Sequence, residues 1–283
     1  MKQATARCPV TLYAPAKLNL TCDVLSKRPD GYHELDLLNL RVALFDELEF
    51  APTESTDVVY DGMPAPENDL VARAIRAYSD RAGRDAHAHV HVHKRIPAQA
   101  GLGGGSADAA AVLQAMETAY GALEPAELHA AALSLGADVP YCLHTEPCRA
   151  RGIGELLEPL AIGGTLWFLL LKPEAGISTA ALFSALSLPV PHPRTNEAIA
   201  TLEIGDSAML GPLLNNALQP SAQVLLPEIG ELCVRLKKAG ALGASMTGSG
   251  SAVFGLFACE SAARSAQAAF GDVPFSAVCR SLP

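Results

Sequence analysis

Residues 96–113, IPAQAGLGGGSADAAAVL, place a glycine-rich loop between a short apolar stretch and an alanine-rich segment typical of a helix. Four glycines stand between positions 101 and 105, so the backbone can curl with its N–H groups pointing inward, and no Cβ blocks a ligand. The helix behind the loop adds unpaired first-turn N–H groups and the positive end of its dipole, and we expect Ser106 to cap it. The segment therefore predicts a phosphate-binding loop.

Two familiar nucleotide-binding loops do not match this spacing. A Walker loop places Lys and then Ser or Thr after its last glycine, but Ser106 and Ala107 follow Gly105. A dinucleotide fingerprint that starts at Gly101 requires Gly or Ala at position 106, which disfavours a nicotinamide-dependent oxidoreductase. Taken alone, the loop leaves a plain turn open as an alternative.

Length and charge limit the classes of protein and partner. The chain has 283 residues, enough for two packed domains, and 49% of them are apolar. Its formal net charge is -9, which argues against binding of nucleic acid or an anionic membrane surface, because both require clustered cations. One small anionic ligand remains compatible with this charge.

Cysteine usage and apolar runs indicate a soluble protein that we expect in the cytoplasm. The seven cysteines are scattered and form no CxxC pair, which is typical of reduced thiols rather than a disulfide framework. The apolar run at 166–171 is too short to span a bilayer, and the first seventeen residues contain no apolar signal region.

Strands and helices alternate without a steady βαβ repeat, which predicts an α+β fold. We expect strands at 10–24 (a pair, or one bent strand interrupted by Pro15), 41–50, 57–60, 86–94, 165–171, 252–258 and 275–279. We expect helices at 70–81, 106–120, 125–136, 178–187, 195–203, 227–239 and 260–270. Asn68 or Asp69 should cap the first of these helices and Gly83 should end it, with one apolar stripe formed by Val71, Ala74, Ile75 and Tyr78. A weak change of composition near 148–158 suggests a domain boundary.

The segment 86–94, AHAHVHVHK, alternates strictly, so four histidines share one face of the predicted strand. Histidines at i and i+2 can bind a metal ion. We interpret them instead as a half-exposed polar face opposite buried Ala and Val, because no Cys, Asp or Glu joins the set.

Four more segments place polar residues at strand ends and turns: APAKLNLTCDV (14–24), RPDGYHELDLL (28–38), LSLGADVPY (133–141) and MTGSGSAVFGLF (246–257). Together with the glycine-rich loop, and in this order, they resemble the GHMP kinase family of galactokinase, homoserine kinase and mevalonate kinase. NDLVARA (68–74) and KPEAGISTAALF (172–183) add weaker matches, so the resemblance covers nearly the whole chain.

The resemblance implies an α+β, two-domain GHMP kinase fold. Residues 1–157 would form an ATP-binding domain like domain 2 of ribosomal protein S5, and residues 158–283 a ferredoxin-like domain. PAKLNL with DGYH and GADVP narrows the resemblance to one branch of the family. That branch uses ATP and Mg²⁺ to phosphorylate the 2-hydroxyl of 4-diphosphocytidyl-2-C-methyl-D-erythritol, a cytidine diphosphate-linked polyol of the non-mevalonate isoprenoid pathway.

The resemblance also implies roles for individual residues. Asp138 would be the general base, and Lys17 would keep it ionised and steady charge on the γ-phosphoryl group. The triphosphate would lie in the loop of Pro97, Ala98, Gln99, Ala100, Gly101, Leu102, Gly103, Gly104, Gly105, Ser106 and Ala107. The substrate would be bound by Asn19, Tyr32, His33, Thr179 and Phe183. The late loop, 247–251, would pack against the phosphate loop and shape it.

Each side chain also has a plainer structural interpretation. Lys17 alone would read as a solvated strand lysine, and Asp138 as a cap of the next turn. Tyr32 would belong to the core and His33 to a surface turn, while Thr179 and Phe183 would be a helix cap and a helix-core residue.

The chain departs from the family pattern in two places. Gln99 and Ala100 stand where many relatives carry glycine, which leaves the backbone path of the loop open. Ala217 stands where the family usually has an acidic residue, and we interpret that position as structural.

Two alternatives remain at this point. Another GHMP kinase, of the homoserine or mevalonate type, would keep the glycine-rich loop but should lack DGYH beside PAKLNL. A catalytically inactive relative that senses a ligand would tend to lose Lys17 or Asp138, and both are present. The expected partner is a small molecule, and the sequence leaves monomer or homodimer open.

Overall fold

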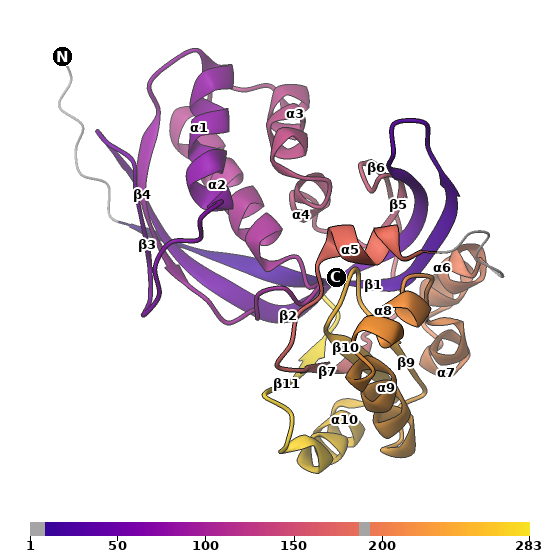
Figure 1. Ribbon diagram of the computed structural model, residues 1–283. Helices are drawn as coiled ribbons and strands as arrows, with labels where there is room; N and C mark the ends of the chain where they lie inside the picture. Colours follow the sequence, from indigo (N-terminus) through magenta and orange to yellow (C-terminus); the bar gives the residue numbers. More distant parts are fainter. Residues whose placement is uncertain (1–8, 187–192) are drawn as a thin grey trace. The chain divides into compact units, whose positions relative to one another are not determined.

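The computed structural model describes residues 9–186 and 193–283 (Figure 1). These residues form two compact units, each with its own hydrophobic core. Of the described residues, unit 1 comprises 9–16, 45–96 and 103–144, and unit 2 comprises 17–44, 97–102, 145–186 and 193–283. The chain passes between the units several times because strands β1 (Val10–Lys27) and β2 (His33–Thr53) contribute residues to both. The proposed boundary after residue 157 stays a prediction.

Unit 1 is a sheet with helices on one face (Figure 1). Strand β4 (His87–His93) pairs antiparallel with β2 and parallel with β3 (Asp57–Tyr60). Ala88, Val90 and Val92 of β4 are buried in the same core as the helices. These helices are α1 (Leu70–Ala82), α2 (Gly104–Tyr120), α3 (Pro125–Leu135) and α4 (Val139–Cys142).

Helix α1 confirms its sequence prediction closely. Asp69 is the N-cap residue and accepts a 2.8 Å hydrogen bond from the backbone N–H of Val71. Gly83 ends the helix in the left-handed conformation, with φ of 58°, where glycine avoids the Cβ penalty. The predicted apolar stripe is buried: Val71, Ala74, Ile75 and Tyr78.

Helix α2 begins earlier than predicted, at Gly104, and the expectation that Ser106 caps it is wrong. Gly103 is the N-cap residue, with φ of 71°, and it has no side chain to bond the first turn. Glycine reaches this conformation without steric cost, so the loop turns directly into the helix. The first-turn N–H groups therefore have no side-chain cap.

The polar face of β4 contains more than histidine. His91 Nε2 contacts Asp61 Oδ1 at 2.7 Å, and Glu49 on β2 lies directly opposite His91 in the antiparallel register. The sequence interpretation that no acidic residue joins the histidines is therefore wrong. Carboxylates from neighbouring strands are added by sheet pairing, which spacing within one strand does not reveal.

Unit 2 contains a four-stranded antiparallel sheet in the order β11-β7-β10-β9. Its strands are β7 (Trp167–Lys172), β9 (Gly243–Met246), β10 (Val253–Phe257) and β11 (Phe275–Arg280). Helices α9 (Glu228–Lys238) and α10 (Glu260–Gln267) pack on this sheet, and their buried side chains join the unit 2 core. This arrangement agrees with the expected α+β class.

The remaining strands of unit 2 extend β1 and β2. Strand β5 (Cys148–Gly152) pairs with β2 and with β6 (Leu156–Pro159), and β8 (Asn215–Asn216) pairs with β1. The other helices are α5 (Thr179–Ser184), α6 (Thr195–Ile204), α7 (Ser207–Leu210), α8 (Gln219–Leu225) and the 3₁₀ turns Gly211–Leu213 and Ala268–Phe270.

Among residues 9–186 and 193–283, no helix combines the length and apolarity that crossing a membrane requires.

Two strand predictions need correction. The structure has one uninterrupted strand, β1, that runs through Pro15, so the predicted break is wrong. Strand β2 begins at His33 rather than at residue 41, because the stretch 36–40 is buried throughout and lacks the alternation that marks a half-exposed strand.

Candidate active site

Strand β1 places Lys17 and Asn19 on one face by its two-residue repeat. Both are almost fully buried, with 3% and 1% of their surface exposed. Lys17 Nζ donates a 2.7 Å hydrogen bond to Asn19 Oδ1, and Asn19 Nδ2 donates to Asn39 Oδ1 at 2.5 Å. Burying an ammonium group is costly unless it is bonded, so Lys17 is not the solvated strand lysine of the plainer interpretation.

The first half of the glycine-rich loop, 97–102, is fixed within unit 2 by backbone hydrogen bonds. The N–H of Lys17 donates to Leu102 O at 2.9 Å. The N–H groups of Ser251 and Ala252 donate to the carbonyl oxygens of Gln99 and Ala100, at 3.3 and 3.2 Å. The late loop thus packs against residues 99–100, as predicted.

Close packing explains the glycine at position 101. A Cβ there would lie 2.2 Å from the carbonyl oxygen of Thr247, and its φ of 71° also favours glycine. Thr247 Oγ1 accepts a 3.0 Å hydrogen bond from the N–H of Asn19, so the same residue touches the loop and the Lys17 strand. The late loop therefore links the two predicted motifs.

Gln99 is the one non-glycine residue of the described ranges with a positive φ, 51°. This left-handed backbone is one that glycine adopts more readily than other residues, which agrees with the expectation of a glycine at this position in the family pattern. Its side chain lies against Gly176, where an added Cβ would come 2.5 Å from Gln99 Oε1. The backbone at Gln99 thus has a conformation that glycine favours. The Gln99 side chain fits because the neighbouring Gly176 has no side chain.

The second half of the loop, Gly103 to Ala107, belongs to unit 1 and forms the start of α2. A Cβ on Gly104 would lie 3.0 Å from Ile96 Cγ2, so the helix start packs closely on the residue that leads into the loop. Gly105 is exposed, and Ser106 is half-buried in the first turn. First-turn N–H groups without a side-chain cap suit an anionic oxygen.

A buried ionic group beneath this helix start was missed by sequence reasoning. Asp46 Oδ1 accepts hydrogen bonds of 2.6 and 2.8 Å from the N–H groups of Arg95 and Ile96, while its other oxygen pairs with Lys94 Nζ. The same ammonium donates to Asp108 Oδ2 at 2.6 Å. The sequence feature that could have indicated this group is Asp108, a charged residue in the alanine-rich helix predicted at 106–120.

Asp108 accepts fewer hydrogen bonds than Asp46, the other carboxylate that pairs with Lys94. It is buried, and among the described residues its Oδ1 has no hydrogen-bond partner. Burial raises the pKa of Asp108 to about 7; Lys94 opposes the shift and the neighbouring Asp46 adds to it. A carboxyl group with a pKa of about 7 is partly protonated near neutral pH.

Asp138 directly precedes α4, and α4 packs against α2 within unit 1. The residue is half-buried, and its side chain makes no capping hydrogen bond to α4. Asp138 therefore stands at the N-cap position of α4, as the plainer interpretation has it, but its side chain does not cap the helix. Lys17 and Asp138 belong to different compact units, so their cooperation stays a prediction.

The residues predicted to bind the cytidine end lie in unit 2. His33 follows the turn at Asp30 and Gly31, and its ring stacks on Phe183 of α5 with centroids 5.0 Å apart and planes at 27°. Burial, together with the charge of Lys27, lowers the pKa of His33. Tyr32 is 61% exposed, so it is not a core residue.

Thr179 opens α5 and donates a 2.8 Å hydrogen bond from Oγ1 to Ser249 Oγ of the late loop. It is not the helix cap, because Ser178 occupies that position. Ala217 is buried, and its N–H donates to Cys22 O at 2.8 Å, in agreement with a structural role.

Comparisons with known proteins show two family matches. A model described as the GHMP kinases N terminal domain matches residues 69–146, and one described as GHMP kinases C terminal matches residues 196–273. The matches lie on either side of the proposed boundary and do not fix it.

Individual relatives cover nearly the whole chain. Proteins named 4-diphosphocytidyl-2-C-methyl-D-erythritol kinase, from Pelotomaculum thermopropionicum and Citrifermentans bemidjiense, are 41% and 40% identical to it. The first match spans 92% of this chain and 93% of the relative, and the second 91% and 92%.

Solved structures share the fold. A crystal structure of 4-(cytidine 5'-diphospho)-2C-methyl-D-erythritol kinase is 34% identical, with a TM-score of 0.83 over 97% of this chain and all of the other. A homoserine kinase from Cytophaga hutchinsonii, 21% identical, has a TM-score of 0.76 over 99% of this chain and 96% of its own, which supports the fold alone.

Proposed function

The chain belongs to the GHMP kinase family, and on that premise we propose that it transfers the γ-phosphoryl group of ATP to the 2-hydroxyl of 4-diphosphocytidyl-2-C-methyl-D-erythritol. The observation that best supports this acceptor is the stacking of His33 on Phe183. It supplies an aromatic surface for a nucleobase in the unit that also contains Lys17 and the first half of the loop.

The phosphate loop would bind ATP through backbone N–H groups. Pro97 to Leu102 are held by the late loop and by β1, and Gly103 to Ala107 begin α2 without a side-chain cap. Such a backbone suits a triphosphate because it offers N–H donors without the bulk of a Cβ. Mg²⁺ would neutralise phosphate charge when bound; as a hard cation that prefers oxygen ligands, it fits phosphate oxygens and a nearby carboxylate.

Phosphoryl transfer depends mainly on positioning and on stabilising charge. In this proposal the carboxylate of Asp138 accepts the proton of the acceptor hydroxyl. The buried ammonium of Lys17, bonded to Asn19, stabilises negative charge on the transferred group. Asn19 serves as a positioning residue and as a hydrogen-bond donor near that group.

The cytidine end of the substrate would lie against the turn at 30–33 and helix α5. Exposed Tyr32 offers a ring for stacking, and His33 and Phe183 offer the second surface. Thr179 would line the same pocket next to Ser249. We propose the cytoplasm as the compartment, since that is where ATP is abundant.

An assay of ADP release with ATP, Mg²⁺ and four acceptors tests the proposal. The acceptors are the diphosphocytidyl methylerythritol, homoserine, mevalonate and galactose, and we expect turnover with the first alone. Asp138→Asn should lower kcat by at least a thousandfold and leave the affinity for an ATP analogue unchanged. Turnover of homoserine or mevalonate instead would retain the family and refute the cytidine-linked acceptor.

A further inference from the structure

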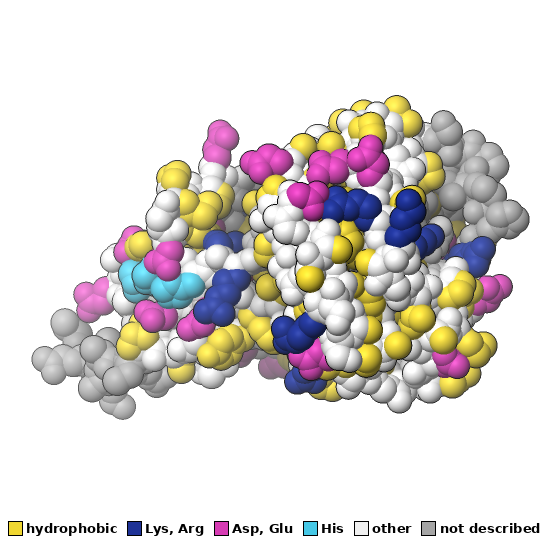
Figure 2. Space-filling model, turned by 90° about the horizontal axis from the view of Figure 1, so that it is seen from below, with side chains coloured by type: hydrophobic (Ala, Val, Ile, Leu, Met, Phe, Trp, Pro, Cys, Tyr) yellow, Lys and Arg dark blue, Asp and Glu magenta, His cyan; other side chains and the backbone are white. Residues whose placement is uncertain are grey.

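A second group of polar side chains lies on the sheet face of unit 1 that points away from the helices. Glu49 comes from β2, His91 and His93 come from β4, and Asp61 directly follows β3. We call these four residues the histidine–carboxylate cluster. Figure 2 shows a patch of histidine side chains bordered by acidic side chains on the face seen from below.

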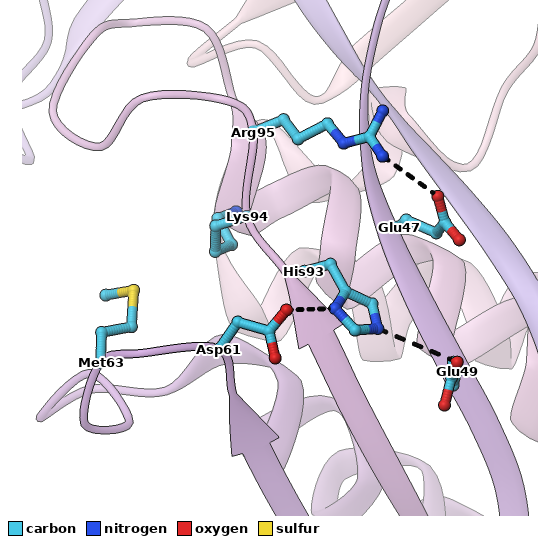
Figure 3. A pocket seen from close by; sticks show the side chains of 7 residues that line it. All are labelled: Glu47, Glu49, Asp61, Met63, His93, Lys94 and Arg95. Carbon is cyan, nitrogen blue, oxygen red and sulfur yellow. Dashed lines mark hydrogen bonds and ion pairs between the residues drawn. The ribbon is translucent and has the colours of Figure 1, made fainter.

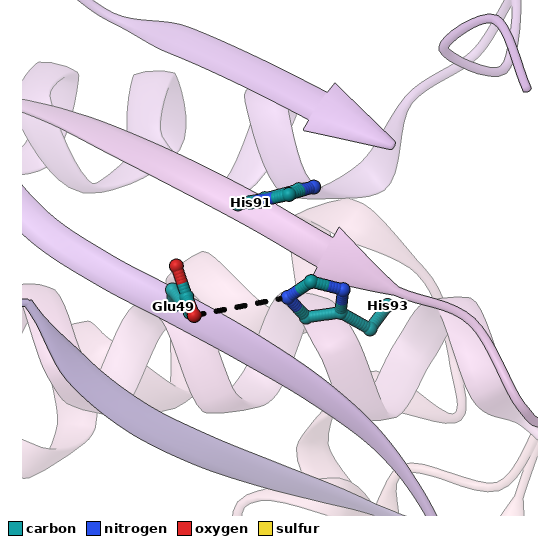
Figure 4. A group of neighbouring side chains, drawn as sticks. All are labelled: Glu49, His91 and His93. Atoms are coloured by element: carbon teal, nitrogen blue, oxygen red, sulfur yellow. Dashed lines mark ion pairs between the residues drawn. The ribbon is translucent and has the colours of Figure 1, made fainter. Parts of the chain in front are cut away.

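Three members of the cluster offer ligand atoms at short mutual distances. One atom each from Glu49, His91 and His93 lies within 4.8 Å of the other two (Figure 4). The two imidazole centroids are 4.3 Å apart, and His93 Nε2 is 4.0 Å from Glu49 Oε1. Strand pairing fixes this geometry, because Glu49 is in direct register with His91 and the two histidines share one face of β4.

Asp61 orients the imidazoles from the other side. Figure 3 shows its carboxylate at Nδ1 of His93 while Nε2 of the same ring points toward Glu49. Asp61 Oδ1 also contacts His91 Nε2 at 2.7 Å. A carboxylate that accepts the Nδ1–H of an imidazole leaves the Nε2 lone pair available, which is the usual support for a metal-bound histidine.

We propose that Glu49, His91 and His93 form a binding site for a borderline divalent transition-metal ion such as Zn²⁺, with Asp61 orienting His93. Two imidazole nitrogens and a carboxylate oxygen suit such ions, whereas Mg²⁺ and Ca²⁺ favour all-oxygen sites. Tetrahedral ligands at about 2.0–2.1 Å from zinc are roughly 3.3 Å apart, so the 4.0 Å between Glu49 Oε1 and His93 Nε2 must shorten by about 0.7 Å, and ligand atoms of the site that lie as far as 4.8 Å apart must approach further.

The surroundings favour a cation and leave one coordination position for water. A cavity of about 490 Å³ adjoins the cluster and is lined by Glu47, Glu49, Asp61, Met63, His93, Lys94 and Arg95 (Figure 3). The two cations of this lining are already paired, Lys94 with Asp46 and Asp108, and Arg95 with Glu47 at 3.6 Å. Glu49 and Asp61 are half or more exposed, so the ion can enter from solvent.

Calorimetric titration of the metal-free protein with ZnCl₂, in the absence of ATP, tests the site. Because Cys259 is an exposed thiol, all proteins carry Cys259→Ser. We expect one Zn²⁺ per chain, with an affinity that falls at least tenfold in His93→Gln and in Glu49→Gln. His89→Gln is the matched control: His89 lies on the same face of β4 but pairs with Asp57 at 3.1 Å, and its substitution should change the affinity less than twofold.

Thermal unfolding gives an independent readout. Since an ion that binds only the folded state raises stability, Zn²⁺ should raise the Tm of the parent and of His89→Gln but not that of His93→Gln. If His89→Gln and His93→Gln lose the Zn²⁺-dependent rise in Tm to the same extent, the strand binds metal as a run of histidines, and the proposal is wrong. Absence of stoichiometric Zn²⁺ binding in a folded parent would also overturn it.

Discussion

The ammonium of Lys17 donates a 2.7 Å hydrogen bond to Asn19 Oδ1, two residues along the same strand, and both side chains are buried. Asn19 in turn donates to Asn39 and, through its backbone, to Thr247 of the late loop. The position of the cation is thus fixed by β1, β2 and the loop that packs against the phosphate-binding segment.

Asn19→Ala should displace Lys17 because it removes this acceptor. We expect kcat to fall at least tenfold and the free energy of unfolding to fall by about 1–3 kcal/mol, the cost of an unsatisfied buried group. Asn19→Asp retains an acceptor for Lys17 but loses the Nδ2 donor to Asn39 and adds a negative charge near the transferred group, so we expect it to recover at most part of the stability and little of kcat. Steady-state kinetics and urea unfolding provide the measurements; wild-type kcat in a folded Asn19→Ala variant would refute the positioning role.

Gly101→Ala should disrupt the contact between the phosphate loop and the late loop. The new Cβ would lie 2.2 Å from Thr247 O at a positive φ, so we expect a loss of about 2–4 kcal/mol in unfolding free energy, with weaker ATP binding. Gly105→Ala is the control for stability, since its Cβ would meet Leu70 Cδ1 at an ordinary 3.5 Å. Equal stability of the two variants, measured by urea unfolding, would contradict the packing argument.

Asp108 gives the protein a pH dependence of known sign. Its folded pKa of about 7 exceeds the ordinary value, so the folded state binds the proton more tightly. The resulting stabilisation is complete below the ordinary carboxyl pKa of 3.8 and is lost progressively as pH rises from there through 7. Between pH 5 and pH 8 the wild type should therefore lose more unfolding free energy than Asp108→Asn, by an amount on the order of 1–3 kcal/mol.

Urea unfolding at the two pH values measures this difference, with Asp85→Asn, a change at an exposed carboxylate, as the control. The control should follow the wild type. A pH dependence that is identical in Asp108→Asn and the wild type would assign the proton to another group.

Phe183→Leu keeps the size and apolarity of the side chain but removes the aromatic face that stacks on His33. We expect it to raise the KM for the cytidine-linked substrate by roughly 5- to 100-fold, equivalent to about 1–3 kcal/mol of stacking, while the KM for ATP changes little. His33→Ala should act in the same direction. A parallel rise in the KM for ATP would place the ring pair outside the acceptor pocket.

Local sequence rules predicted those parts of the fold that depend on local chemistry. Helix α1 was predicted with its cap and buried stripe because Asp69, Gly83 and the 3.6-residue repeat act within a few residues. The start of β2 was missed because its first residues are buried, so no alternation marks the strand.

Contacts between distant strands could not be predicted in the same way. Spacing within β4 gave no sign that Glu49 and Asp61 would join His91 and His93, and nothing local linked Asp46 to Lys94. The stacking of His33 on Phe183 joins residues 150 positions apart (183 − 33), which local spacing could not reveal; their role in binding, inferred from resemblance, stays a prediction.

In the proposed function the acceptor site recognises cytidine, and the inhibition pattern of CDP tests this recognition directly. Initial rates are measured at several CDP concentrations while the cytidine-linked polyol and ATP are varied in turn. We expect CDP to compete with the polyol substrate, and we expect its inhibition not to be relieved by raising the ATP concentration. Inhibition that ATP relieves and the polyol does not, or no inhibition at all, would show that the acceptor site does not recognise cytidine.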